Sequence, residues 1–263
     1  MTAIQGTALV TGASGGIGQA IARALAARGA EVVLTGRRAD VLEPLAQELR
    51  GRALAVDLAE RDAVERLAEQ AGEVEILVAN AALPGTGLLD DFTVTEVDRA
   101  LDVNLRAPIV LAKLLGEQMA RRGHGHIVFI SSLSGKAASP RGSLYSATKF
   151  GLRGFALALR EDLKPAGVGV STIFPGFIRD AGMWVNAGAR LPKGVGTRTP
   201  QDVADGVVRA IERNRAEVDV APVALRVGAA IAGLAPELSA RVSELLGGTR
   251  VAEALADGHR GNR

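Results

Sequence analysis

The stretch Thr7-Ala8-Leu9-Val10-Thr11-Gly12-Ala13-Ser14-Gly15-Gly16-Ile17-Gly18 decides the fold class of this chain. It begins as a short apolar run, breaks into a glycine-rich loop and passes at once into a helical pattern through Ile21 and Leu25 to Gly29. Glycines permit a tight turn and let backbone N–H groups approach a pyrophosphate at the positive end of a helix. The spacing G-x-x-x-G-x-G therefore predicts a phosphate-binding turn. The alternative is a glycine-rich strand-to-helix turn without a ligand.

The alternation of strand and helix continues along the chain. Apolar runs predict strands over residues 7–10, 31–35, 53–56, 76–79, 127–130, 168–174 and 218–220. Helical patterns lie between them, over about 40–50, 59–71, 94–122, 144–163 and 202–213. Such alternation predicts an α/β fold with a doubly wound, Rossmann-type parallel sheet of about seven strands and helices on both faces. With no linker or repeat in sight, we expect a single domain over residues 1–263.

The second predicted strand ends in Gly36-Arg37-Arg38. A unit that binds NAD usually has Asp or Glu here, hydrogen-bonded to the adenosine ribose. Two arginines stand in its place, and their charge and fork geometry suit a 2′-phosphate. The alternative is an exposed basic pair at a helix start. We expect NADP(H), with NAD(H) as the competing cofactor.

Tyr145 is the sole tyrosine of the chain, and Lys149 follows it at the spacing of one helical turn. The helix that carries them has Ser143 available as N-cap and stops before Pro165. A free phenol has a pKa of about 10, and a nearby cation favours the phenolate. We therefore expect Lys149 to lower the pKa of Tyr145. The alternative is a surface Tyr and Lys on an amphipathic helix.

Composition excludes several other functions. The formal charge is +2, aromatic residues are 3% of the chain, and no dense basic stripe occurs, so nucleic acid is not an expected partner. The absence of cysteine excludes disulfides, thiolate catalysis and Cys-ligated zinc. No basic segment with a cleavage signal precedes Thr7, and the apolar segment 218–234 contains Asp219 and Arg226. We expect a cytoplasmic protein without a membrane span.

Taken together, the motifs resemble the short-chain dehydrogenase/reductase family in its compact single-domain form. The resemblance spans Thr7 to about Val220. Its parts occur in the family's order: the glycine-rich loop from Thr11 to Gly18, Asp57, Asn80-Ala81-Ala82, Asn104, Ser132, Tyr145-x-x-x-Lys149 and Pro175-Gly176.

The resemblance implies catalytic roles for Asn104, Ser132, Tyr145 and Lys149. Tyr145 would donate a proton to a carbonyl oxygen as hydride reaches the carbon, and Ser132 would hydrogen-bond the same oxygen. Lys149 would hold the nicotinamide ribose as well as depress the pKa of Tyr145. Asn104 would hold a water of a proton relay, although a helix-kink role fits its sequence context equally well.

The resemblance also implies a cofactor site along the carboxyl ends of the strands. Its expected members, besides Tyr145 and Lys149, are Gly12, Ser14, Gly15, Gly16, Ile17, Gly18, Arg37, Arg38, Asp57, Leu58, Asn80, Ala81, Ala82, Pro175, Gly176 and Ile178. The sequence departs from the family at three of its positions. Ala82 replaces the usual glycine, Gly15 stands where NADP-preferring relatives often have a basic residue, and Asp180 replaces a threonine near the nicotinamide amide.

The remaining expectations concern the substrate, partners and metals. Residues 177–199, with Met183 and Trp184, would form a substrate lid, and 222–263 a C-terminal helical extension suited to subunit contact. A peripheral membrane contact of that extension is the alternative. His124 and His126 are too few for a metal site, so none is expected.

The function that we expect is an NADP(H)-dependent oxidoreductase that interconverts a small ketone or aldehyde and its alcohol, as a homodimer or homotetramer. An NAD(H)-dependent enzyme and a cofactor-binding redox sensor or scaffold without turnover are the rivals. The small residues Gly151, Gly154, Ala156 and Ala158 place the expected subunit interface on the Tyr145 helix.

Overall fold

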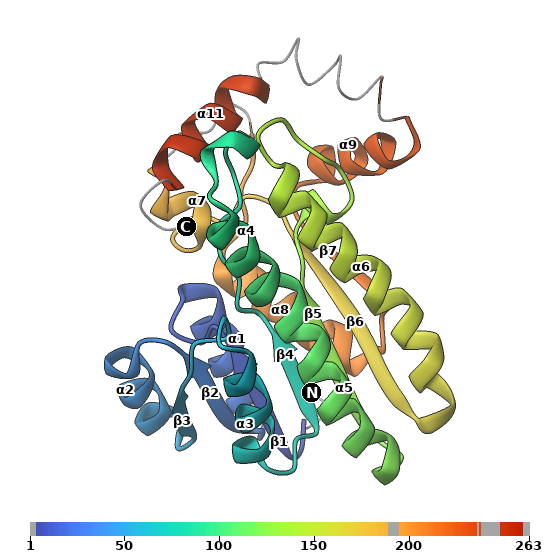
Figure 1. Cartoon of the computed structure of the whole chain (residues 1–263). Coiled ribbons are helices and arrows are strands. Elements are labelled where there is room, and N and C mark those ends of the chain that lie inside the picture. The colour runs from blue at the N-terminus through green and yellow to red at the C-terminus, as the bar shows by residue number, and fades with distance from the viewer. Residues whose placement is uncertain (1–3, 189–194, 236, 238–247, 260–263) are drawn as a thin grey trace.

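The computed structural model describes residues 4–188, 195–235, 237 and 248–259. Its centre is a parallel sheet with the strand order β3-β2-β1-β4-β5-β6-β7 (Figure 1). The strands are β1 (Thr7–Thr11), β2 (Glu31–Gly36), β3 (Arg52–Ala55), β4 (Ile76–Ala79), β5 (Gly125–Ile130), β6 (Val168–Pro175) and β7 (Glu217–Val220). The chain winds outward in both directions from β1 and β4. The carboxyl ends of these two strands are therefore the switch point, where ligands bind in such sheets.

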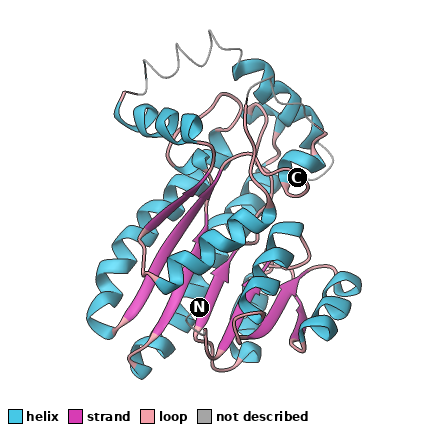
Figure 2. Cartoon of the chain, turned by 180° about the vertical axis from the view of Figure 1, so that it is seen from behind, coloured by secondary structure: helices cyan, strands magenta, loops and turns pink. Residues whose placement is uncertain are grey.

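Helices cover both faces of the sheet, as Figures 1 and 2 show from opposite sides. One face carries α1 (Gly16–Ala26), α2 (Ala39–Leu49) and α8 (Pro200–Glu212), and the other carries α3 (Arg61–Ala71), α5 (Ala107–Arg122) and α6 (Ser143–Leu163). Successive strand residues point to opposite faces. Val10 of β1 accordingly packs toward α1, whereas Leu9 packs toward α3 and α5. The sheet is thus buried between two apolar cores, which confirms the predicted doubly wound fold.

The long helix expected over 94–122 is one rod with a local change of winding. It consists of α4 (Val94–Leu101), a π-helical segment η2 (Asp102–Arg106) and α5. Thr93 caps α4 by accepting from the Glu96 N–H at 3.2 Å. The π-helical segment contains Asn104, so this residue lies where the rod departs from regular α geometry. π-Helical turns of this kind are frequent at functional sites.

Two local expectations were wrong. Ser143 is the first residue of α6 rather than its N-cap, which is Gly142, whose backbone carbonyl accepts from the Ser146 N–H at 2.7 Å. β5 begins at Gly125, two residues before the strand predicted over 127–130, so that His126 lies within it. It is buried, and its Nε2 lies 2.8 Å from the Ser171 hydroxyl of β6.

Near the carboxyl edge of the sheet, in the upper part of Figure 1, lie α7 (Met183–Asn186), α9 (Val223–Leu234) and α11 (Gly248–His259). Parts of the expected lid and of the expected C-terminal extension, residues 189–194, 236, 238–247 and 260–263, lie outside the described residues, as does the side chain of Trp184. In the portion of the chain that is described, no helix combines the length and the apolar character that crossing a membrane requires.

Candidate active site

The glycine-rich loop follows β1 and is fixed to the end of β4 by side-chain hydrogen bonds. The buried Thr11 hydroxyl accepts from the Asn80 and Ala81 N–H groups, both at 3.0 Å. In return the Asn80 amide donates to the carbonyls of Thr11 at 2.9 Å and Gly12 at 3.2 Å. These bonds hold together the two strands of the switch point. The loop therefore has a fixed shape before any ligand arrives.

Glycine is required at several loop positions by close backbone approach. Gly12 has a φ of 64°, and a Cβ on it would lie 2.8 Å from the Cα of Ala81. A Cβ on Gly18 would collide with the Gly12 carbonyl, and one on Gly16 would lie 2.5 Å from the Cβ of Ala181. By contrast, a Cβ on Gly15 would meet only the Gly12 carbonyl, at 3.5 Å. The cradle at the start of α1 thus has the form that a pyrophosphate needs.

The end of β2 lies beside this cradle. A Cβ on Gly36 would lie 3.0 Å from the Ser14 hydroxyl oxygen, so an acidic side chain at position 36 would have to displace Ser14. Arg38 donates through Nη2 to the Ser14 carbonyl. Arg37 is exposed and close enough to Asp57 to help lower the pKa of that carboxyl. Both arginines expected from the sequence therefore lie at the open side of the cradle.

Asp57 follows β3 and is engaged from two sides. Its Oδ1 accepts from the Ala59 N–H at 3.0 Å, and its Oδ2 accepts from Nη2 of Arg99 on α4 at 2.8 Å. Burial raises the pKa of Asp57, but the Ala59 N–H and the Arg99 guanidinium outweigh it, so the pKa lies below its ordinary value. The carboxylate is therefore ionised at neutral pH. The adjacent Leu58 is buried.

Ser132 lies just beyond the carboxyl end of β5, and Tyr145 lies in the first turn of α6. Ser132 begins the 3₁₀ turn η3 (Leu133–Gly135), and its hydroxyl accepts from the Ser134 N–H at 3.1 Å. The Ser132 hydroxyl lies close enough to the Tyr145 phenol to act on it as a hydrogen-bond partner and to lower its pKa. Burial raises the pKa of Tyr145 to about 12, and the Ser132 hydrogen bond only partly offsets this. The phenol is consequently protonated at neutral pH.

Lys149 is fully buried one turn along α6, and its Nζ donates to the Ile130 carbonyl at 3.0 Å. Nζ lies 5.6 Å from the centroid of the Tyr145 ring. Burial lowers the pKa of Lys149 to about 8. In the protein without nucleotide, burial rather than Lys149 has the largest effect on the pKa of Tyr145, and the ammonium is directed at a carbonyl.

Asn104 is buried, and both the oxygen and the nitrogen of its amide form hydrogen bonds with the backbone of Leu83. Its Oδ1 accepts from the Leu83 N–H at 2.6 Å, and its Nδ2 donates to the Leu83 carbonyl at 2.9 Å. Two residues on, the Gly85 carbonyl accepts from the Tyr145 N–H at 3.2 Å. A Cβ on Gly85 would lie 3.1 Å from the Tyr145 nitrogen. Asn104 thus ties the π-helical segment to the loop that leads past Tyr145, which fits the helix-kink interpretation of this residue.

The other expected residues lie around the same edge. Asn80, Ala81 and Ala82 follow β4, Pro175 ends β6, and Gly176 donates its N–H to the Val220 carbonyl at 3.0 Å. Ile178 is buried and Ile17 lies close to Gly182. Asp180 is exposed, has a φ of 69° and pairs with Arg179 at 3.6 Å. Among the described residues, no three His, Cys, Asp or Glu side chains are arranged for a metal ion.

Two residues of the site escaped the sequence interpretation. Arg99 holds Asp57 from a position 42 residues further along the chain, and nothing in its local sequence indicates this. Thr11 is the buried acceptor that joins β1 to β4, and its place at the head of the glycine-rich motif could have indicated a structural hydroxyl.

The glycine cradle, Ser132, Tyr145 and the buried Lys149 all lie at the carboxyl edge of a Rossmann-type sheet. The chain belongs to the short chain dehydrogenase family, whose sequence profile matches residues 6–191. It is a short-chain dehydrogenase/reductase, an oxidoreductase.

Known proteins of the family cover most of the chain. The ketoacyl reductase HetN of Nostoc sp. (strain PCC 7120) is 36% identical over 230 residues, which are 84% of this chain and 80% of that protein. Nodulation protein G of Rhizobium sp. (strain N33) is 42% identical over 180 residues, 66% of this chain and 74% of that protein. The structure of a short-chain dehydrogenase from Sphingobium yanoikuyae in complex with NADPH is similar with a TM-score of 0.77 and 28% identity. This similarity covers 89% of this chain and 95% of that one.

Proposed function

We propose that the protein reduces a ketone or aldehyde to the alcohol with NADPH, and catalyses the reverse oxidation with NADP+. The observation that carries this proposal is that Ser132, Tyr145 and the buried Lys149 lie together at the same edge of the sheet as the glycine cradle. The Ser132 and Tyr145 side chains come from rigid elements, and both lie at the edge of the sheet to which the cradle opens.

When bound, a nicotinamide cofactor would supply the hydride that adds to the carbonyl carbon. The Tyr145 phenol gives its proton to the carbonyl oxygen, and the Ser132 hydroxyl hydrogen-bonds that oxygen as negative charge develops. Lys149 holds the ribose of the nicotinamide and lies on the path by which Tyr145 regains a proton. Asn104 fixes the loop at Leu83 and thereby the backbone packed against Tyr145.

At neutral pH the Tyr145 phenol is in the protonated form that carbonyl reduction requires. Because burial raises the pKa of Tyr145 to about 12, the phenol retains the proton that reduction consumes. Oxidation needs the phenolate as a base, which is the rare form under these conditions.

Arg37 and Arg38 support NADP(H) over NAD(H). Gly36 has no side chain, and Ser14 occupies the space that an acidic residue there would need. Arg38 donates through Nη2 to the Ser14 carbonyl, which leaves the rest of its guanidinium to bind a 2′-phosphate. Arg37 is exposed beside it. A guanidinium is well suited to a phosphate because its donors form a planar fork. The NADPH complex of the Sphingobium yanoikuyae relative agrees with this choice.

The test of the proposed function replaces only the proton donor. Tyr145→Phe keeps the ring and is expected to lower kcat by at least about a hundredfold, the low end for general acid–base catalysis. NADPH affinity, measured by fluorescence titration, should change little. Near-normal turnover by the Phe variant would exclude Tyr145 as the acid, and loss of NADPH binding would indicate damage to the fold instead.

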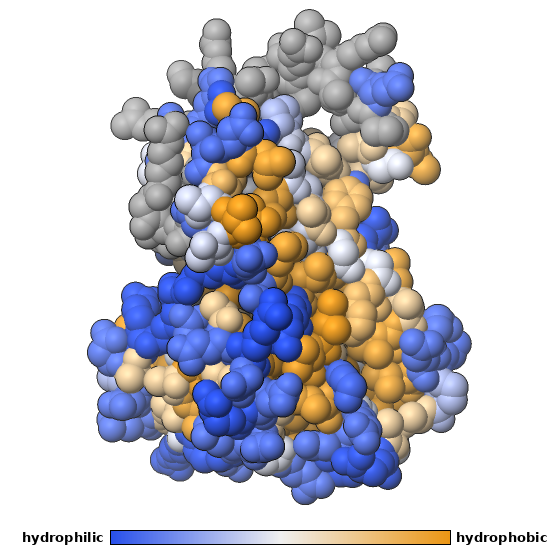
Figure 3. Space-filling view, viewed as in Figure 1, coloured by the Kyte–Doolittle hydropathy of each residue, from blue (hydrophilic) through white to orange (hydrophobic). Residues whose placement is uncertain are grey.

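We also propose that the protein is a homo-oligomer. Phe150 and Leu157 on α6 are each 41% exposed, and Figure 3 shows a continuous apolar area over the α4, α5 and α6 side of the molecule. Of the small residues expected at this interface, Ala156 is buried within the subunit and Gly151 lies against Leu105, whereas a Cβ on Gly154 would meet nothing within 4 Å. A second copy of the chain covering Phe150 and Leu157 would remove this apolar surface from water.

A further inference from the structure

Lys136 follows the turn that carries Ser132, and its side chain crosses to the edge strand β7. Its Nζ lies 3.0 Å from a Glu217 carboxylate oxygen and 2.6 Å from one of Asp219. It also lies 4.1 Å from the centroid of the Phe174 ring, and only 14% of the side chain is exposed. Lysine is almost never buried to this degree without partners. The three contacts therefore fix where the ammonium, and the backbone next to it, can lie.

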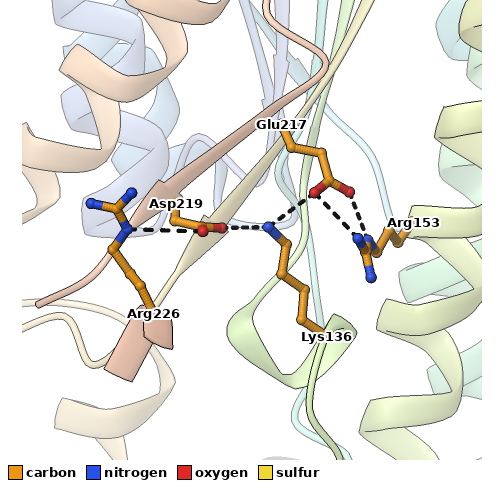
Figure 4. Close-up of polar contacts among 5 residues, drawn as sticks. All are labelled: Lys136, Arg153, Glu217, Asp219 and Arg226. Atoms are coloured by element: carbon orange, nitrogen blue, oxygen red, sulfur yellow. Dashed lines mark hydrogen bonds and ion pairs between the residues drawn. The ribbon is translucent and has the colours of Figure 1, made fainter. Parts of the chain in front are cut away.

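These contacts belong to a larger group, the β7 ion cluster, drawn in Figure 4 and composed of Lys136, Arg153, Glu217, Asp219 and Arg226. Arg153 donates through Nε to Glu217 at 2.6 Å and through Nη2 at 3.3 Å, from a position on α6 one turn beyond Lys149. Arg226, at the outer end, lies 3.9 Å from Asp219 and is half exposed. The cluster thus joins the Ser132 turn, the Tyr145 helix and β7.

Glu217, at the centre of the cluster, is ionised at neutral pH. Burial raises the pKa of Glu217, but the hydrogen bonds from Arg153 and Lys136 outweigh burial and bring it below its ordinary value. Glu217 is therefore an anion held between two cations from different elements. A shift of either element would separate a buried charge from its partner, which is costly.

The side of the Ser132 turn that faces away from β7 is tightly packed against α6. A Cβ on Gly135 would lie 2.6 Å from the Ser131 hydroxyl oxygen and 2.7 Å from the Lys149 carbonyl oxygen. The Ser131 hydroxyl itself donates to the Lys149 carbonyl at 3.2 Å. The turn is consequently pressed against α6 on one side and anchored to β7 by Lys136 on the other.

We propose that Lys136 is a positioning residue, which holds the Ser132 hydroxyl within hydrogen-bond range of the Tyr145 phenol. Its use in catalysis rests on the proposed function. Buried ion pairs contribute little net stability compared with apolar residues of the same volume. The cluster contacts both the segment that carries Ser132 and the helix that carries Tyr145. A role in fixing the relative position of these two residues explains it better than a role in stability, because a displacement of about 1 Å can cost about a hundredfold in rate.

The first experiment observes the hydrogen bond without turnover. Because Tyr145 is the only tyrosine, protein labelled with ¹³C at tyrosine Cζ gives a single resonance that responds to hydrogen bonding of the phenol. Ser132→Ala is expected to displace this resonance, and Lys136→Met to displace it in the same direction. Lys136→Arg, which keeps a cation, should restore it in part, and Arg226→Met, the matched control at the outer end, should leave it unchanged.

A Lys136→Met resonance that coincides with the wild type, while Ser132→Ala is displaced, would overturn the proposal. If Lys136→Met does not yield folded protein, Asp219→Asn is measured in its place. That variant leaves the Glu217 contact intact and is expected to give a smaller displacement in the same direction. No displacement in this folded variant would likewise count against Lys136 as the anchor. This measurement holds whether or not the proposed reaction is observed.

The second experiment is a double-mutant cycle in NADPH-dependent carbonyl reduction. Lys136→Met alone is expected to lower kcat by about ten- to a hundredfold, with NADPH affinity within about twofold of the wild type. In the Ser132→Ala background the same substitution should have little further effect, since it acts through Ser132. Equal losses in both backgrounds would show a merely structural role and refute the proposal. Absence of reduction by the wild type would instead contradict the proposed function.

Discussion

The ionisation of Tyr145 in the protein without nucleotide is the sharpest expectation that the site offers. Burial raises the pKa of this phenol to about 12, although the hydrogen bond with Ser132 acts in the opposite direction. A phenol with a pKa of about 12 is about one-tenth ionised at pH 11, whereas an ordinary phenol with a pKa of about 10 is about nine-tenths ionised. At about pH 11 the ionised fraction of the tyrosine therefore distinguishes the two cases clearly.

The assay uses the fact that the chain has one tyrosine. Tyrosinate absorbance near 295 nm is followed after a rapid jump from neutral pH to about pH 11, before alkaline unfolding exposes the phenol. We expect a small fast amplitude, followed by a larger one as the protein unfolds. Tyr145→Phe supplies the baseline, because it should lack both amplitudes. Ser132→Ala should reduce the fast amplitude further, since it removes the hydrogen bond that lowers the pKa.

Lys149 provides the decisive comparison. Burial lowers the pKa of Lys149 to about 8, so its amine is neutral at the pH where Tyr145 titrates. Lys149→Met should therefore leave the fast amplitude nearly unchanged. A fast amplitude near nine-tenths in the wild type, or a marked decrease in the Lys149→Met variant, would refute this reasoning and restore the view that the lysine charge governs the phenol.

Three further predictions concern the cofactor, stability and assembly. Arg37→Ala should weaken NADPH binding about tenfold in titrations and leave NADH nearly unchanged, because only the 2′-phosphate is lost as a partner; equal losses would favour NAD(H). Burial, with a smaller effect of Arg160, lowers the pKa of His126 to about 4. The contribution of neutral His126 to stability is therefore fully present above about pH 6.5 and is lost at lower pH. We expect the free energy of unfolding, measured with denaturant, to fall by about 2 kcal/mol between pH 7 and pH 5, and His126→Gln should flatten this pH dependence. Leu157→Asp should convert the oligomer to a monomer by light scattering, whereas Lys164→Asp, on an exposed 3₁₀ turn, should not; a monomeric wild type would exclude the interface.

The fold could be predicted because its signals are local. Most strands of the sheet are apolar runs, and each strand has four to eight residues. In the turn after β1, a Cβ on Gly12 or Gly18 would collide with nearby backbone, so these positions require glycine. Tyr145 and Lys149 lie one turn apart on α6, as their spacing predicts. Patterns of period two and 3.6 residues report such neighbours directly.

The supporting contacts of the site could not be predicted in this way. Asp57 is held by Arg99 across 42 residues, Leu83 by Asn104 across 21, and Asp219 by Lys136 across 83. Each pair joins elements that become neighbours only in the folded sheet. From the sequence alone, many other residues of the chain would serve equally well as partners. The π-helical segment is similar, because nothing in the run from Asp102 to Arg106 distinguishes it from an α-helix.

The pKa of Tyr145 shows why spacing alone does not determine the electrostatics of a site. Spacing places Lys149 beside the phenol, but the effect of a charge depends on where its atom points and on how much water surrounds both groups. Here the ammonium is directed at the Ile130 carbonyl, 3.0 Å away, because a buried Nζ must find an acceptor. Removal from water then disfavours the charged forms of both residues, raising one pKa and lowering the other. The phenol consequently keeps its proton at neutral pH, and the site is set up in advance to donate rather than to accept.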